Sequence, residues 1–182
     1  MTLSTSLLLR CVATVFTAST LAVSLYAAPS ATAFAELKGA KGQAISGKLE
    51  FTQQDGAVHI VGQVTHLSPG QHGIHVHDKA DLSAPDLSSA GGHFNPTKEQ
   101  HGSPDAAHHH VGDFGNITAD ENGTAKVDLT VAGLSLSGAN SIIGHSIIIH
   151  GGTDDLKSQP AGNSGPRVAG GVIVATTGAG SS

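Results

Sequence analysis

Residues 73–77 read Gly73-Ile74-His75-Val76-His77, an apolar run that carries two histidines two positions apart. Side chains alternate between the two faces of a β-strand, so a strand here would present both imidazoles on one face. Histidine is the commonest metal ligand, and two imidazoles on a rigid strand can begin a copper or zinc site. Taken alone, this pair also fits a surface strand or a hydrogen-bonded pair of core histidines.

Short strand-like runs continue on both sides of this stretch and are separated by turn signals. Asp55-Gly56 and Asn122-Gly123 are typical of hairpin turns, and the apolar residues of the runs beside them alternate. Two polar segments, 78–112 and 151–166, show no clear period; structureless segments of this length are usually functional or disordered. The sequence therefore predicts an all-β domain of eight strands with two long functional loops. The predicted strands are 34–38, 44–53, 58–64, 73–77, 114–119, 124–131, 146–150 and 168–175.

The composition excludes several classes of protein. The chain has 182 residues, the size of one domain, and 38% of them are hydrophobic, which is enough for a core and excludes a disordered chain. Its 24 glycines follow no Gly-X-Y period, so it is no collagen, and the pattern of short runs excludes a multi-span membrane protein. A net charge of −5 offers no basic surface to nucleic acid. The 12 histidines outnumber the 9 lysines and arginines, which again indicates metal.

Residues 1–33 are predicted to be a secretory leader, followed by one domain at 34–182. Arg10 is the only charge before Glu36, an apolar stretch of small residues follows it, and Ala31-Thr32-Ala33 fits a small-x-small cleavage site. The alternative is a membrane anchor, and the cleavage position stays open because 34–38 already reads as a strand. We expect an exported protein, periplasmic or extracellular, with no stable membrane association once the leader is removed. The single cysteine, Cys11, lies in this leader, so the domain is expected to contain no disulfide.

A second group of histidines lies between residues 93 and 113. His93, His101, the tract 108–110 and Asp113 fall within 21 residues, and zinc accepts both imidazole nitrogen and carboxylate oxygen. Two of the three histidines in the tract also fit a flexible polar segment, and Asp113 fits a turn. His150 ends an apolar strand, where histidine is most often a core or rim residue.

Together, these stretches resemble the copper/zinc superoxide dismutase family over residues 37–174. The resemblance rests on long motifs that occur in the family's order. They are Gly70-Gln71-His72-Gly73-Ile74-His75-Val76-His77, Ser89-Ala90-Gly91-Gly92-His93-Phe94-Asn95-Pro96, His110-Val111-Gly112-Asp113-Phe114-Gly115-Asn116-Ile117-Thr118-Ala119-Asp120, Ile142-Ile143-Gly144 with His150, Asp154-Asp155-Leu156 and Gly162-Asn163-Ser164-Gly165-Pro166-Arg167.

The resemblance implies an eight-stranded Greek-key β-sandwich or barrel of immunoglobulin-like type that dismutes superoxide to oxygen and hydrogen peroxide. It implies that copper and zinc are the cofactors, that superoxide anion is the substrate and that the chain forms a homodimer. The implied copper ligands are His75, His77, His93 and His150, and the implied zinc ligands are His93, His101, His110 and Asp113. His93 would bridge the two metals and carry a proton, and Arg167 would dock the anion. His72 would brace the copper site, and Asp154 would link His75 to His101.

The sequence departs from the family pattern where the family has a disulfide. The two cysteine positions correspond to Leu87 and Gly170, so no half of the bridge is left. We expect Leu87 to pack where the bridge would lie, and the first long loop to be held only by this packing and by the zinc ligands. Because the bridge anchors a loop near the family's dimer interface, its absence puts dimerisation in doubt.

A non-catalytic copper/zinc-binding module on the same fold is the alternative function. Non-catalytic relatives often lack a copper histidine or the docking arginine, and this chain keeps both. A structural zinc protein would leave His75, His77 and His150 unexplained. Asn116 and Asn122 match the glycosylation acceptor pattern, and their modification stays open.

Overall fold

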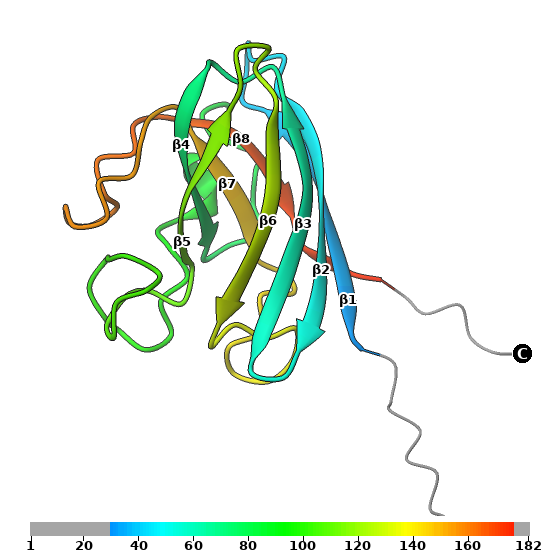
Figure 1. Ribbon diagram of the computed structural model, residues 1–182, viewed down its shortest axis with the longest axis vertical. Coiled ribbons are helices and arrows are strands. Elements are labelled where there is room, and N and C mark those ends of the chain that lie inside the picture. Colours follow the sequence, from blue (N-terminus) through cyan, green and yellow to red (C-terminus); the bar gives the residue numbers. More distant parts are fainter. Residues whose placement is uncertain (1–29, 177–182) are drawn as a thin grey trace, which may run out of the picture.

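The computed structural model describes residues 30–176, and these form an antiparallel β-barrel (Figure 1). All eight predicted strands are present, with ends that shift by at most three residues. The last one is divided, because Ile173 leaves the neighbouring strand and exchanges backbone hydrogen bonds with Gly144 and His145. The elements are β1 (Thr32–Gly39), β2 (Ser46–Gln54), β3 (Ala57–Thr65), β4 (Gly70–His77), the 3-10 turn η1 (Ser88–Ala90), β5 (Asp113–Ala119), β6 (Ala125–Ala132), β7 (Ser146–His150), β8 (Arg167–Val172) and β9 (Val174–Ala175).

The strands follow the order β2-β3-β6-β5-β4-β7-β8-β1-β9, and a further pairing of β1 with β2 closes the sheet. Because β3 pairs with β6 and β4 pairs with both β5 and β7, the chain crosses between non-neighbouring strands in the Greek-key manner. Alternating residues fill the interior, as the sequence predicts: Leu49 and Phe51 of β2 face Val58, Ile60 and Val64 of β3, all of them buried.

Strand β4, like its neighbour β7, is covered on both faces. Ile74 and Val76 belong to the main apolar core, while His75 and His77 point to the opposite face under the two long loops. An antiparallel strand with one solvated face shows clean alternation of burial, but here every residue from His72 to His77 is buried. The strand that carries the first histidine pair is therefore fixed from both sides.

The predicted leader meets the barrel at its first strand. Ala33 pairs with Phe51 and is buried, so cleavage after Ala33 would remove the first two residues of β1. The rest of the predicted leader, up to residue 29, lies outside the described residues. Within 30–176, no helix is long and apolar enough to span a membrane.

The first long loop is held more firmly than the sequence predicts. Leu87 does pack in a small apolar cluster with Ala40, Ala90 and Ile148. However, the expectation that only this packing and the zinc ligands hold the loop is wrong. The amide of Lys41 donates to the carbonyl of Pro85 (2.9 Å), that of Lys79 to Ala90 (3.0 Å), and the hydroxyl of Ser146 to Lys79 (2.7 Å). Buried backbone groups must find such partners, and a pattern of side chains does not reveal which ones they find.

Candidate metal centre

Four histidines from three parts of the fold converge beside β4. His75 and His77 come from β4, His93 from the first long loop and His150 from the end of β7. One ring nitrogen of each lies within 4.8 Å of the others. The β4 pair is at most 1% exposed and His150 is 4% exposed, so this cluster lies beneath the surface.

His93 also belongs to a second cluster, with His101, His110 and Asp113. Asp113 Oδ1 lies 2.7 Å from Nδ1 of His93, 3.0 Å from Nδ1 of His101 and 3.2 Å from Nδ1 of His110. Three imidazole nitrogens and one carboxylate oxygen therefore meet at one point. His93 turns Nδ1 toward this cluster, which leaves its Nε2 for the first one.

Several buried ring nitrogens in the two clusters make no hydrogen bond. Among the described residues these are Nδ1 of His75, Nε2 of His93 and Nδ1 of His101, together with Nδ1 of His145 outside the clusters. A buried polar atom without a partner costs about 1–3 kcal/mol, so these orphaned atoms call for a ligand. Imidazole suits both copper and zinc, and carboxylate oxygen suits zinc. The residues present therefore fit two metal ions that share one histidine.

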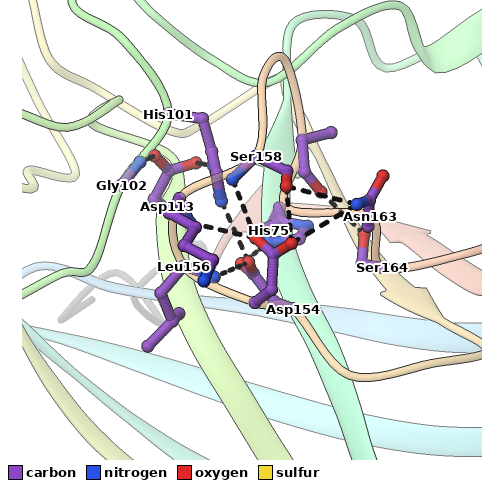
Figure 2. A network of polar contacts seen from close by, with 12 residues as sticks. His75, His101, Gly102, Asp113, Asp154, Leu156, Ser158, Asn163 and Ser164 are labelled. Atoms are coloured by element: carbon purple, nitrogen blue, oxygen red, sulfur yellow. Dashed lines mark hydrogen bonds and ion pairs between the residues drawn. The ribbon is translucent and has the colours of Figure 1, made fainter.

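Asp154 connects the two clusters through one histidine of each, His75 and His101 (Figure 2). Its buried Oδ2 accepts a hydrogen bond from His75 Nε2 at 2.8 Å, and its Oδ1 accepts one from His101 Nε2 at 2.9 Å. These bonds fix the proton of both rings on Nε2, which leaves Nδ1 of each free to bind metal. Burial opposes ionisation, but the bonds from His101 and His75 prevail and hold the pKa of Asp154 well below its usual range.

Asn116 holds the backbone of Asp154 in place. Its amide oxygen accepts from the Asp154 N–H (2.8 Å), and its amide nitrogen donates to the Asp154 carbonyl (2.9 Å). In the sequence, Asn116 appears as a glycosylation acceptor and within a family motif, but with no role in the site. The structure instead uses both ends of its side chain inside the fold, next to the metal clusters.

His72 contacts the backbone on both sides of the first cluster. Its Nδ1 lies 2.7 Å from the carbonyl oxygen of His150, and its Nε2 lies 2.8 Å from that of Ser68. It is 2% exposed. The ring therefore connects the end of β7 to the turn before β4.

Arg167, at the start of β8, is fixed by the first long loop. Its Nη1 donates to the carbonyl of Leu87 (2.7 Å), and its Nη2 donates to the carbonyl of Gly91 (2.6 Å). The Gly91 carbonyl also accepts from Nδ1 of His77 at 3.0 Å. One carbonyl group thus holds both the guanidinium and a histidine of the first cluster. Burial lowers the pKa of Arg167, but guanidinium stays charged at any physiological pH.

The two clusters differ in their electrostatics. Burial, followed by repulsion from neighbouring imidazoles, lowers the pKa of His77 to about 2 and that of His150 to about 3. Burial also lowers the pKa of His93 to about 4, although Asp113 opposes the shift. Burial opposes protonation of His101, but the adjacent carboxylates of Asp113 and Asp154 prevail and raise its pKa to about 9. At pH 7 His77, His93 and His150 are therefore neutral and offer lone pairs, whereas in the second cluster His101 carries a proton and Asp113, whose pKa its hydrogen bonds to histidine hold well below the usual range, is ionised.

The structure brings the residues that the sequence predicts as metal ligands together in two clusters. The two predicted ligand sets coincide with the two clusters, and His108 and His109 lie outside both, as a polar tract would. Sequence reasoning missed Asn116 and Gln159, the second of which bonds the backbone of His101. Asn116 lies within a family motif that does not indicate this role, and Gln159 has no sequence signal, because an amide that binds backbone can occur in many contexts.

Comparisons with known proteins find a matching family model and several similar proteins. The family model described as Copper/zinc superoxide dismutase (SODC) matches residues 45–173. An extracellular superoxide dismutase [Cu-Zn] of Brugia pahangi is 41% identical over 153 residues, which cover 79% of this chain and 76% of that protein. One of Caenorhabditis elegans is 42% identical over 133 residues, covering 70% of this chain and 60% of that protein. A crystal structure of the clock protein EA4 superposes with a TM-score of 0.74 at 42% identity, covering 84% of this chain and 99% of that one.

Proposed function

Because the chain belongs to the copper/zinc superoxide dismutase family, a family of oxidoreductases that bind copper and zinc, we propose that it dismutes superoxide at the paired clusters. The observation that carries the proposal is His93, whose two ring nitrogens face two different sets of ligands. A single imidazole shared in this way connects the cluster proposed for redox-active copper to the cluster proposed for zinc. The proposed reaction takes two superoxide anions and two protons to oxygen and hydrogen peroxide.

We assign copper to the first cluster on the basis of its free nitrogen atoms. Nδ1 of His77 is occupied by the Gly91 carbonyl and Nδ1 of His150 by the Gly165 carbonyl, so both rings offer Nε2. These two Nε2 atoms lie 3.4 Å apart. His75 offers Nδ1 and His93 offers Nε2, which completes an all-nitrogen set suited to Cu(II).

We assign zinc to the second cluster because it contains the carboxylate. Three imidazoles and Asp113 supply four ligands with one negative charge, a set typical of zinc. Asp154 holds the ring of His101 from the other side, which orients Nδ1 toward Asp113. His93 then completes the set through Nδ1.

When bound, copper would supply a one-electron couple in the first cluster and zinc a fixed positive charge in the second. The chain supplies the proton transfer and the anion site. Nε2 of His93 is buried without a partner, so it is the atom that can take up a proton and pass it to the peroxide product. Arg167 is pinned by two carbonyls beside His77, so its charge is available to orient the anion. With a net charge of −5, attraction of superoxide must come from this local field.

We also propose that the protein is exported and acts outside the cytoplasm. Both reported relatives are named extracellular, and residues 1–33 fit a secretory leader. The homodimer remains a prediction that sedimentation of the purified protein will test. A non-catalytic metal-binding module is not favoured, because the chain keeps every histidine of both clusters and Arg167.

Replacing His150 by alanine tests the copper assignment. The variant should lose most of its copper and its dismutase activity but keep its zinc, because His150 belongs only to the first cluster. His59→Ala is the matched control: His59 pairs with Asp128 at 2.8 Å on the outer face of β3 and β6 and belongs to neither cluster. Metal analysis and superoxide consumption are measured on both. Full activity in His150→Ala would contradict the copper site.

Replacing Asp113 by alanine tests the zinc assignment. Asp113 is the only charged ligand of the second cluster and contacts all three of its histidines, so the variant should release zinc. Its melting temperature should fall as well, because metal affinity contributes directly to folding free energy. Zinc content and melting are compared with those of the wild type. Normal zinc content in the variant would show that the assignment is wrong.

A further inference from the structure

The backbone of His101 lies in an irregular segment of the first long loop and depends on one side chain. Its N–H donates to Oε1 of Gln159 at 2.9 Å, and its carbonyl accepts from Nε2 of Gln159 at 2.9 Å. Within residues 30–176, neither of these two groups has another partner. His101 is 4% exposed, so its backbone N–H and carbonyl cannot replace these bonds with hydrogen bonds to water.

Gln159 itself is exposed, but the turn that carries it is tied at its base. The Asp155 carboxylate accepts from the N–H and the hydroxyl of Ser158, at 2.8 and 2.6 Å. The Gly162 N–H donates to the Ser158 carbonyl at 2.7 Å, and the Asp155 N–H donates to the Gly162 carbonyl at 2.8 Å. Figure 2 shows Ser158 in this network, beside Asp154. The turn therefore presents the Gln159 amide from a defined position.

The same turn holds His101 at both ends of the residue. Asp154 accepts from the ring, and Gln159 binds the peptide groups on either side of the Cα. The ring bond alone leaves the backbone free to move, and the position of Nδ1 would move with it. With both contacts in place, Nδ1 of His101 stays 3.0 Å from Asp113 Oδ1, inside the second cluster.

We propose that Gln159 is a positioning residue for His101 and that it controls how tightly the second cluster holds zinc. This inference rests on the proposed assignment of His101 as a zinc ligand. Partners that orient metal ligands contribute about 10- to 100-fold to metal affinity. Because Gln159 acts through the backbone of one ligand among four, we expect an effect of about tenfold, at the lower end of that range.

The chemistry of the contact predicts an order among variants. Glutamine matches a peptide because it has one acceptor and two donors on the same planar group. Gln159→Glu keeps the acceptor for the His101 N–H but loses the donor for the carbonyl. Gln159→Met keeps the length of the side chain and loses both bonds to His101, together with the bond from Nε2 to the Lys157 carbonyl at 3.2 Å. Zinc should therefore be held in the order glutamine, glutamate, methionine.

The experiment measures zinc release from the zinc-loaded full-length protein to an excess of a coloured chelator. Release should be about ten times faster for Gln159→Met than for wild type and intermediate for Gln159→Glu. Gln53→Met is the matched control. Gln53 also bridges loops through its amide, accepting from the Leu136 N–H and donating to the Ala57 carbonyl, both at 2.8 Å, but it contacts neither cluster. This control should release zinc at the wild-type rate.

A second measurement separates positioning from general loosening of the fold. With Co²⁺ in the second cluster, the d–d absorption bands report ligand geometry and should shift in Gln159→Met but not in Gln53→Met. Wild-type release together with an unchanged cobalt spectrum in Gln159→Met would overturn the role of Gln159 alone. If Gln159→Met does not fold, the same two measurements on Gln159→Glu decide the question by the same criterion. A wild-type chain that binds no zinc would overturn the zinc assignment, and the role of Gln159 with it.

Discussion

Joining residues 87 and 170 through a disulfide should stabilise the metal-free protein, and the structure sets the size of the gain. Leu87 is buried next to β8, and a Cβ placed on Gly170 would lie 3.4 Å from Leu87 Cδ1. Gly170 is not among the glycines with positive φ, so its backbone accepts a cysteine. The double variant Leu87→Cys, Gly170→Cys therefore places two thiols on facing positions.

The expected gain in the free energy of unfolding is the loop-closure stabilisation minus two packing costs. Closing a loop of about 84 residues stabilises the folded state by about 4.5 kcal/mol. Losing part of the buried Leu87 side chain costs about 2 kcal/mol, at the low end for truncations of buried leucine because cysteine refills some of the space. The new Cβ would lie 2.7 Å from Cδ1 of Ile148, and moving that side chain off its rotamer costs about 1 kcal/mol. The oxidised variant should therefore be about 1.5 kcal/mol more stable than wild type, and the reduced variant about 3 kcal/mol less stable.

Thermal melting of the metal-free proteins, with and without reductant, checks these values. In a domain of this size, 1 kcal/mol corresponds to about 2–4 °C, so oxidation should raise the melting temperature of the double variant by about 9–18 °C. Each single variant serves as a control, and the wild type, whose one cysteine cannot form an intrachain bridge, should not respond to reductant. A double variant that oxidises fully but melts no higher than its reduced form would refute this reasoning.

Two further predictions concern charge. Arg167→Glu should keep its metals but consume superoxide at least about tenfold more slowly, and Arg167→Lys should recover part of the rate; equal rates for wild type and Arg167→Glu at low ionic strength would exclude a docking role. The second prediction concerns the metal-free protein, in which the pKa values of His77, His93 and His150 lie near 2, 4 and 3. The unfolded chain binds protons below about pH 6.5 and the folded chain does not, so the free energy of unfolding should fall by about 2 kcal/mol or more between pH 7 and 5. The raised pKa of His101 opposes this fall, because folded His101 stays protonated over the range while the unfolded chain takes up this proton near pH 6.5; its stabilisation grows by only about 1 kcal/mol from pH 7 to 5, and denaturant midpoints that do not change with pH would contradict the prediction.

The strands and the first histidine pair could be predicted because their signals are local, whereas the full sets of candidate ligands were implied by the family resemblance. In β2 and β3 a period of two separates core from surface, and in β4 the same period places His75 and His77 together. The ends of β1 and the splitting of the last strand could not be predicted in this way. They depend on which distant backbone pairs with which, as when Ile173 pairs with the segment before β7 and not with β1.

The side-chain contacts that hold the loops around the candidate site were harder to predict, because they too involve distant backbone groups. Arg167 is held by the carbonyls of Leu87 and Gly91, and the backbone of His101 is held by the side-chain amide of Gln159. Almost every residue type has the same backbone N–H and carbonyl groups, so the residue type at these positions does not indicate the contact. The family motifs therefore predict the candidate metal ligands, whereas the loop contacts that hold these side chains are visible only in the folded structure.

The two clusters depend on a small backbone junction that joins β4 to the first long loop. The amide of Val76 donates to the carbonyl of Gly112 (2.9 Å), that of Gly112 to Phe94 (2.9 Å), and that of Phe94 back to Val76 (2.8 Å). A side chain on Gly112 would collide with the Val76 carbonyl, so glycine is what lets the three segments meet. Because Val76 lies in the barrel core, the core and the clusters share this junction. The immediate neighbours of the three residues are cluster members: His75 and His77, His93, and Asp113. Ligands that are far apart in sequence therefore keep their spacing without a disulfide, since the barrel itself sets the positions from which they extend.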